Sequence, residues 1–173
     1  GCKSFAKLTA LDFNDSFSTV IGPNGSGKSN LSEAICFVLG RLSAKSMRVE
    51  RASNLIYNGG KTKEPANQAE VTIVFDNLKN EFPMQEKEIK LTRMVKHNGQ
   101  SVYKINEKKV TRQQIIDLLA SAKIDPDGHN IILQGDIAKF MEMHPGDRRE
   151  IIEEVAGISV YEDKKQKALL ELE

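Results

Sequence analysis

The sequence predicts an α/β fold in which a glycine-rich turn joins a strand to a helix and an antiparallel β-meander follows. Two observations carry this prediction. The β-branched, apolar segment 16–21 leads into the glycine-rich stretch 22–29, and a helical pattern covers 28–39. Strand patterns separated by turn signals then cover 70–76, 89–95 and 101–105.

Composition agrees with a globular α/β chain and excludes several other classes. Of the 173 residues, 39% are hydrophobic and 28% are charged, which is typical of a folded, water-soluble domain. The chain has no signal-peptide pattern and no apolar run near the roughly 20 residues that a membrane helix needs. Cys2 and Cys36 are too few for a disulfide framework, and we expect a buried, reduced Cys36 in a cytoplasmic protein. Because the chain starts at Gly1 rather than Met and stops at Glu173 within a helical pattern, we expect both ends to be cut.

The net charge of +1 hides an uneven distribution along the chain. Segment 87–123 holds nine Lys and Arg against three Asp and Glu, whereas segment 124–173 holds six against twelve. A basic segment of this kind suggests contact with a polyanion, and nucleic acid is the leading candidate. The alternative is a solvated sheet edge, since lysine commonly protects strand edges from pairing.

Each element has its own signal. The helix over 28–39 places apolar side chains on one stripe and stops at Gly40, and 41–69 reads as mostly loop. Asn98-Gly99 is a strong hairpin signal, and Thr111 with Gln114 forms a capping-box pattern at a helix start. The remaining expected elements are a short strand at 130–133, helices at 137–143 and 146–156, and a charged helical pattern from 160 onward.

The most specific motif is Gly22-Pro23-Asn24-Gly25-Ser26-Gly27-Lys28-Ser29, which matches the G-x-x-x-x-G-K-[ST] phosphate loop in full. Glycines let backbone N–H groups turn inward around phosphate oxygens without a side-chain clash. Lys28 supplies a point charge for the β- and γ-phosphates, and Ser29 supplies a hydroxyl for Mg²⁺. The following helix adds the positive end of its dipole, so the sequence predicts binding of a nucleoside triphosphate.

Hydrolysis also needs an acid near Mg²⁺ and a group that orients water. Asp76 ends a strand and is one candidate for the acid, but Thr72 interrupts the apolar run and the strand reads as part of the meander. A turn residue at the sheet edge is therefore the preferred interpretation of Asp76. Gln134 follows the short strand, where its carboxamide can ligate Mg²⁺ and sense the γ-phosphate; the alternative is a turn glutamine without a role.

Several segments, in this order, resemble the N-terminal half of the ATPase head of structural-maintenance-of-chromosomes (SMC) proteins of the archaeal and bacterial chromosomal type. The phosphate loop with Asn30 has the family's form, and the joint order and spacing are specific although the other motifs are weak singly. Those other matching segments are Lys3-Ser4-Phe5, Leu42 to Arg48, Asn130 to Asp136 and Arg148 to Gly157. Cys2 departs from the family pattern, which usually has Phe there.

The resemblance implies a P-loop NTPase fold of the ABC-ATPase type. Residues 1–156 would form the N-terminal lobe of the head, and 157–173 would begin a coiled coil. ATP and Mg²⁺ would be the cofactors, with Lys28, Gln134 and Arg48 in catalytic roles and Ser29 and Gln134 as metal ligands. The residues near the nucleotide would be Lys3, Ser4, Gly22, Pro23, Asn24, Gly25, Ser26, Gly27, Lys28, Ser29 and Asn30.

The resemblance also implies partners. The C-terminal half of the same head would supply the signature loop, the Walker B acid and the catalytic Glu, so this chain alone would be inactive. ATP would drive engagement with the head of a second SMC subunit, in a homodimer also joined through a hinge, and hydrolysis would release the pair. A kleisin subunit would bind near 155–173, and the protein would act on double-stranded DNA in chromosome condensation, segregation or cohesion in the nucleoid, away from membranes.

Two other functions remain open at this stage. Heads of ATPases for DNA double-strand-break repair or recombination share the phosphate loop and the Gln134 segment, although the segment from Leu42 to Arg48 argues against them. In isolation, the chain could instead be a non-catalytic module that binds nucleotide or kleisin. A zinc site is not expected, since His97, His129 and His144 lack ligands at suitable spacing.

Overall fold

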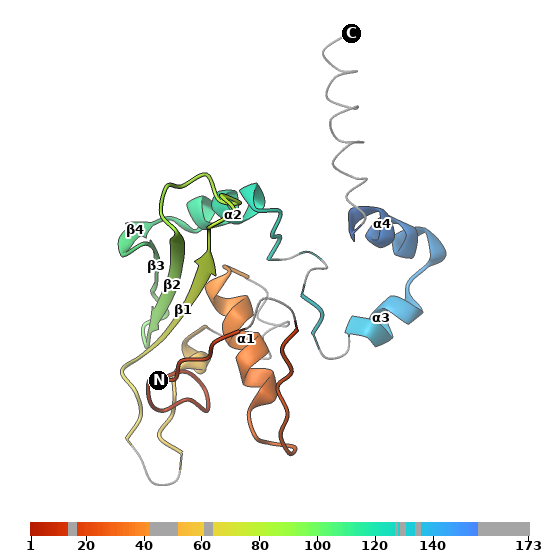
Figure 1. The fold of residues 1–173 in the computed structure, drawn as a ribbon. Coiled ribbons are helices and arrows are strands. Elements are labelled where there is room, and N and C mark those ends of the chain that lie inside the picture. The colour runs from red at the N-terminus through yellow and green to blue at the C-terminus, as the bar shows by residue number, and fades with distance from the viewer. Residues whose placement is uncertain are drawn as a thin grey trace. The chain divides into compact units, whose positions relative to one another are not determined.

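The computed structural model describes residues 1–13, 17–41, 52–60, 64–126, 128, 131–133 and 136–155, with Lys139, Glu150, Glu154 and Val155 described by their backbone alone. The chain forms two compact units, Gly1–Pro126 and Asp127–Glu173. The first contains the sheet, α1 and α2, and the second contains α3 and α4 (Figure 1).

The first unit is built on a four-stranded antiparallel sheet in the order β1-β2-β3-β4. Asn98-Gly99 makes the β2–β3 turn, in which Gly99 has φ +81° and its N–H donates to the Lys96 carbonyl at 2.9 Å, so the predicted hairpin is confirmed. The meander predicted from the alternating patterns is therefore present. Its strands are β1 (Gln68–Asp76), β2 (Glu88–Lys96), β3 (Ser101–Ile105) and β4 (Lys108–Val110).

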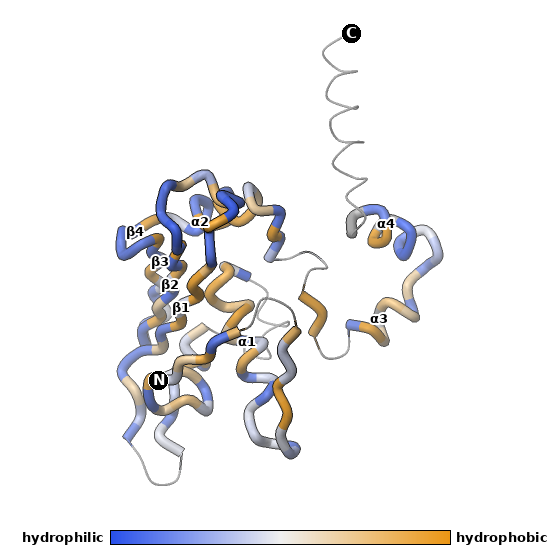
Figure 2. The backbone as a smooth tube through the Cα atoms, viewed as in Figure 1, coloured by the Kyte–Doolittle hydropathy of each residue, from blue (hydrophilic) through white to orange (hydrophobic). Residues whose placement is uncertain are grey.

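Helix α1 (Lys28–Val38) packs on this sheet, mainly on β1 and β2. Its C-terminal half is apolar and its N-terminal half is polar, which Figure 2 shows as a change from pale and blue to orange along the helix. Cys36 and Phe37 are fully buried against the core. Cys36 is a free thiol, as predicted, and burial raises its pKa despite the opposing contact with Arg41.

Helix α2 (Arg112–Ser121) begins with the predicted capping box. The Gln114 N–H donates to the Thr111 hydroxyl at 3.3 Å, and the Thr111 N–H donates to the Gln114 side-chain oxygen at 2.9 Å. Both bonds satisfy donors that the first turn leaves without helical partners. Ile115 and Leu119 are fully buried, one turn apart, and fix the helix on the core of the first unit.

Two strand predictions were wrong. Residues 17–21 are described and form no strand; Phe17 is 84% exposed and Ile21 is 87% exposed. A strand needs a hydrogen-bonded neighbour, and none lies beside this segment among the described residues. Residues 131–133, from the expected strand at 130–133, also form no strand.

The second unit has two described helices, α3 (Asp136–Glu142) and α4 (Pro145–Val155), close to the bounds expected for both. Asp136 begins α3, and its carboxylate accepts from the Leu133 N–H at 2.8 Å. Residues 157–173, expected to begin a coiled coil, lie outside the described residues. In the part of the chain that the structure describes, no helix is both long and apolar enough to cross a bilayer.

Candidate functional site

The phosphate loop before α1 has the backbone that its glycines predict. Gly25 (φ +80°) and Gly27 (φ +96°) both lie in the left-handed region, which side chains disfavour. A Cβ built on Gly22 would lie 2.7 Å from the Ser26 hydroxyl oxygen, so the Ser26 side chain would have to turn away to admit one. The Ser26 N–H donates to the Pro23 carbonyl at 3.2 Å and closes the turn. The loop shape therefore depends on glycine at Gly25 and Gly27, and Gly22 leaves room for the Ser26 side chain.

Lys28 lies back across this loop. Its ammonium donates to the Gly22 carbonyl at 2.6 Å and to the Pro23 carbonyl at 2.8 Å. These two bonds place the positive charge inside the loop rather than out in solvent. A cation held among inward-turned backbone groups is the arrangement that binds the charged oxygens of a phosphate chain.

The N-terminus of α1 is open to an anion. Gly27 is the N-cap residue and supplies no side-chain hydrogen bond to the first-turn N–H groups. The first turn contains no acidic residue that would compete with a bound anion or repel it. Ser29 is exposed on this turn, so its hydroxyl is available to a metal ion beside the phosphates. The helix dipole and the unsatisfied N–H groups both favour negative charge here.

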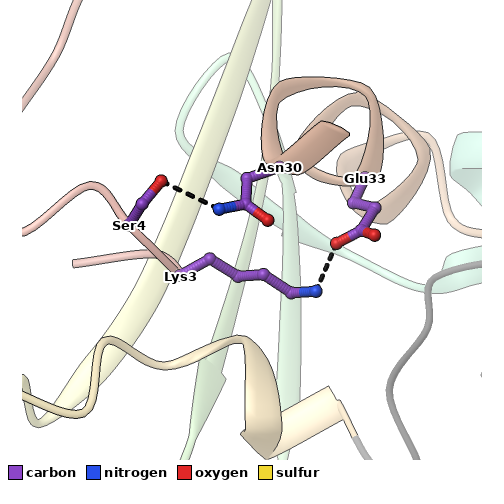
Figure 3. Close-up of polar contacts among 4 residues, drawn as sticks. All are labelled: Lys3, Ser4, Asn30 and Glu33. Carbon is purple, nitrogen blue, oxygen red and sulfur yellow. Dashed lines mark hydrogen bonds and ion pairs between the residues drawn. The ribbon is translucent and has the colours of Figure 1, made fainter. Parts of the chain in front are cut away.

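A turn at the start of the chain bonds to the N-terminal half of α1 through Lys3 and Ser4 (Figure 3). The amide of Asn30, in the first turn of α1, donates to the Ser4 hydroxyl at 2.9 Å. The Lys3 ammonium donates to the Glu33 carboxylate, one turn further along the helix. A Cβ on Gly27 would lie 2.8 Å from the Ser4 hydroxyl oxygen, so the turn touches the loop itself.

The structure therefore brings together many of the residues expected near a nucleotide. Arg48 and Gln134 lie outside the described residues, so their expected roles stay predictions. The expected site residues that lie in one place are Lys3, Ser4, Gly22, Pro23, Asn24, Gly25, Ser26, Gly27, Lys28, Ser29 and Asn30.

Asp76 lies at the end of β1, an edge strand that pairs antiparallel with β2. Its carboxylate accepts from the Leu78 N–H at 2.8 Å, which is the geometry of an Asx turn. These contacts support the interpretation of Asp76 as a turn residue at the sheet edge. Among the described residues, no group of three or more His, Cys, Asp or Glu side chains could hold a metal ion.

Sequence reasoning missed two residues whose side chains hold α1, one in the middle of the helix and one near its C-terminal end. Glu33 is 4% exposed and pairs with Lys3 near the loop. Arg93 is 4% exposed and donates to the Phe37 carbonyl at 2.9 Å, near the C-terminal end of the helix. The signal for Arg93 was its position on the apolar face of β2, between Leu91 and Val95. The signal for Glu33 was its place three residues after Asn30, on the same helix face.

Comparison with known families and curated proteins gives one consistent result. Residues 1–143 match the RecF/RecN/SMC N terminal domain. The chain is 49% identical to the chromosome partition protein Smc of Pyrococcus furiosus, over 99% of the chain and 15% of that protein. It is 43% identical to the chromosome partition protein Smc of Aquifex aeolicus, again over 99% of the chain and 15% of the relative. The chain thus spans 15% of the length of these two relatives.

Solved structures agree. A structure described under "ATP-driven dimerization and DNA stimulated activation of SMC ATPases" matches with TM-score 0.78 and 48% identity, over 84% of this chain and 87% of that one. The Smc head domain of Pyrococcus furiosus, bound to the C-terminal domain of ScpA, matches with TM-score 0.77 and 51% identity, over 87% of this chain and 38% of that one. These neighbours confirm the predicted fold, a P-loop ATPase head of the ABC type. The phosphate loop, the meander and these matches agree that the chain belongs to the RecF/RecN/SMC family and, within it, to the SMC proteins.

Proposed function

We propose that this chain is the nucleotide-binding lobe of an SMC-type ATPase head and that it binds ATP with Mg²⁺ at the start of α1. One observation carries the proposal. The Lys28 ammonium lies inside a glycine-rich loop that leads into an uncapped helix N-terminus free of acidic side chains. A positive charge, open N–H groups and the helix dipole then act together on a polyanionic phosphate chain.

The residues divide this work by their chemistry. Backbone N–H groups of Gly25 to Ser29 cradle the phosphates, and Lys28 moves from the loop carbonyls to the β- and γ-phosphates. The Ser29 hydroxyl and the Gln134 carboxamide would hold Mg²⁺, a hard cation that favours oxygen ligands and keeps several waters. The bound ion would neutralise phosphate charge. Arg48 would contact phosphate or couple DNA binding to hydrolysis, in line with the family resemblance.

Catalysis in this proposal needs groups from other polypeptide segments. Walker B and signature residues would come from the C-terminal half of the same head, and a second SMC head would cover the nucleotide. One structural neighbour supports the role of a second head, since it is described by its ATP-driven dimerization. A kleisin is a further proposed partner, because another neighbour is an Smc head bound to the C-terminal domain of ScpA. We also propose that the protein acts on double-stranded DNA in the cytoplasmic nucleoid.

The test is binding of ATP to the full-length protein with Lys28 replaced by Ala. The change removes the charge without a clash, so we expect ATP affinity to fall at least about tenfold, equivalent to about 1.4 kcal/mol. Isothermal titration calorimetry with Mg-ATP measures this, and Lys7→Ala, at an exposed lysine outside the loop, is the control. Unchanged ATP binding in the Lys28→Ala protein would contradict the assignment of the phosphate loop.

The repair-type ATPase remains the second candidate. It shares the phosphate loop, so nucleotide binding does not separate the two. The two curated relatives compared above are both chromosome partition proteins, which favours the chromosomal role. The non-catalytic alternative predicts that the full-length protein binds ATP without turnover, and a steady-state phosphate-release assay distinguishes it from an ATPase.

A further inference from the structure

Two consecutive side chains in the turn Cys2–Phe5, at the start of the chain, bond to two side chains on one face of α1. Ser4 accepts from Asn30 at 2.9 Å, and Lys3 donates to Glu33 (Figure 3). Asn30 and Glu33 are three residues apart, so they project from the same side of the helix. The turn is thus fixed at two points to the helix that begins at the phosphate loop.

The Lys3–Glu33 pair is mostly shielded from water. The Glu33 side chain is 6% exposed and the Lys3 side chain is 17% exposed. A carboxylate buried to this extent is costly unless it is paired, so Glu33 requires a cation close by. Lys3 supplies that cation, and in this arrangement its ammonium faces the helix rather than the loop.

The turn that carries Lys3 is itself held in a strained shape. Lys3 has φ +45°, in the left-handed region that non-glycine residues rarely adopt. Its N–H donates to the Leu55 carbonyl at 2.6 Å, and Cys2 and Phe5 exchange backbone hydrogen bonds at 2.9 and 2.7 Å. Such strain persists only where surrounding contacts hold it, and the ion pair to Glu33 is one of those contacts.

The consequence reaches the phosphate loop through Ser4. The Ser4 hydroxyl oxygen lies 2.8 Å from the point where a Cβ on Gly27 would stand. Gly27 is both the N-cap of α1 and a left-handed residue of the loop. If the turn Cys2–Phe5 moved, the phosphate loop would therefore lose its contact with Ser4 at Gly27. Gly27 is the residue whose backbone orients the first N–H groups of the helix.

We propose that Glu33 is a positioning residue for the nucleotide. Through its ion pair with Lys3 it holds the turn Cys2–Phe5 on α1 and so keeps Ser4 against Gly27. The inference rests on the proposed function, since it assumes that the loop binds ATP. It gives Lys3 a role that differs from direct phosphate contact: Lys3 acts on the nucleotide through Glu33 and the turn.

The test measures Mg-ATP affinity of the full-length protein by calorimetry in four variants: Lys3→Met, Glu33→Gln, the pair of these together, and the charge swap K3E/E33K. We expect each single change to weaken ATP binding by a similar factor, about tenfold. The double change should be no worse than either single change, because both remove the same contact. The charge swap should recover most of the affinity, since it restores the pair with reversed charges.

Direct phosphate contact by Lys3 gives a different pattern, which would overturn the inference. Lys3→Met would then weaken ATP binding while Glu33→Gln left it unchanged or strengthened it, because Glu33 would only compete with phosphate for the lysine. The charge swap would be the weakest binder, since it places a carboxylate where a cation touches phosphate. Equal affinity of wild type and all four variants would also overturn it.

Two further measurements keep the outcome interpretable if a variant is unstable. Thermal melting without nucleotide shows whether Glu33→Gln folds, and Ser4→Ala removes the last step of the proposed chain without touching the buried carboxylate. Ser4→Ala should lower ATP affinity in the same direction as Glu33→Gln, and wild-type affinity in Ser4→Ala would overturn the inference. Lys28→Ala separates the two proposals: if it loses ATP binding while Glu33→Gln does not, the phosphate loop stands and the positioning role of Glu33 fails.

Discussion

Arg93 is the residue through which the sheet holds the C-terminal end of α1. Its guanidinium donates to the Phe37 carbonyl at 2.9 Å and lies 4.2 Å from the centre of the Phe37 ring and 4.8 Å from that of Tyr103. Burial lowers the pKa of Arg93, with Tyr103 acting in the opposite direction and Arg112 adding to the decrease. A cation is favourable here because the C-terminal end of α1 carries the negative end of the helix dipole.

Replacing Arg93 with Ala should therefore loosen α1. The change removes a charge-assisted hydrogen bond and leaves a gap between two aromatic rings, which together should cost about 2–4 kcal/mol. Hydrogen exchange of the α1 amides in the full-length protein measures this as a lower free energy of opening. Lys104→Ala is the matched control on the same sheet, and its loss of a partly exposed pair with Glu107 should cost no more than about 1 kcal/mol. Equal protection of α1 in the Arg93→Ala and Lys104→Ala proteins would contradict this role.

For single residues, the sequence predicted features that depend on close sequence neighbours better than it predicted long-range contacts. The phosphate loop, the Asn98-Gly99 turn and the capping box at Thr111 were all readable because each depends on residues close in sequence. The Lys3–Glu33 pair joins residues 30 positions apart, so nothing local indicates it. Whether a lysine points at a phosphate or at a carboxylate depends on packing that a single sequence does not contain.

Among the elements, the meander presents basic side chains on the face that points away from α1. Arg93 points toward α1, so its neighbours in β2 project from the opposite face. On that face Thr72 and Thr92 share a hydrogen bond at 2.8 Å, and Thr92 lies opposite Lys104, which in turn lies opposite Lys109. Lys90 and Lys109 are both exposed. The basic segment seen in the sequence thus gathers lysines on one face rather than along a strand edge alone, and this face also carries Glu70, Asp76 and Glu88.

We predict that this face contacts duplex DNA. Each lysine that pairs with a phosphate contributes about 0.9 to the slope of log affinity against log salt, so Lys90→Gln with Lys109→Gln should reduce that slope by up to about 1.8. Mobility shifts of the full-length protein on duplex DNA across a salt series measure it. Lys7→Gln with Lys79→Gln removes the same charge from exposed sites elsewhere in the first unit. Identical slopes for the two double variants would show that the lysines of this face do not touch DNA.

Among the elements, strand prediction succeeded where alternation was long and failed where it was short or lacked a neighbour. β2 was predicted within a residue of its bounds because four inward side chains alternate over seven of its nine residues. β4 was missed because Lys108–Val110 is three residues long and carries no alternation. Segment 16–21 has the composition of a strand, but composition alone does not supply the second strand that its backbone needs.

At the scale of the first unit, the main feature is a surface of exposed apolar side chains that includes those of segment 16–21. The first unit exposes large apolar side chains that cluster along residues 8–21: Leu8, Leu11, Phe13, Phe17, Val20 and Ile21. Soluble monomers rarely expose a long series of this kind, and such surfaces commonly mark an interface. The C-terminal half of the head, proposed above as a partner, is the occupant we expect, because a strand from it would give residues 17–21 the hydrogen-bonded neighbour that a strand needs.

This expectation makes a prediction for the assembled head. The chain produced alone should bind the dye ANS, and adding the C-terminal half of the head should suppress the fluorescence because the apolar side chains become buried. Phe17→Ser with Ile21→Ser should lower the dye signal of the chain alone and weaken its association with that half, measured by calorimetry. Val74→Ser with Leu78→Ser is the matched control, since these residues are 52% and 67% exposed but lie in β1 and just after it. If both pairs of substitutions weakened association equally, or neither did, segment 8–21 would not be the surface on which the C-terminal half docks.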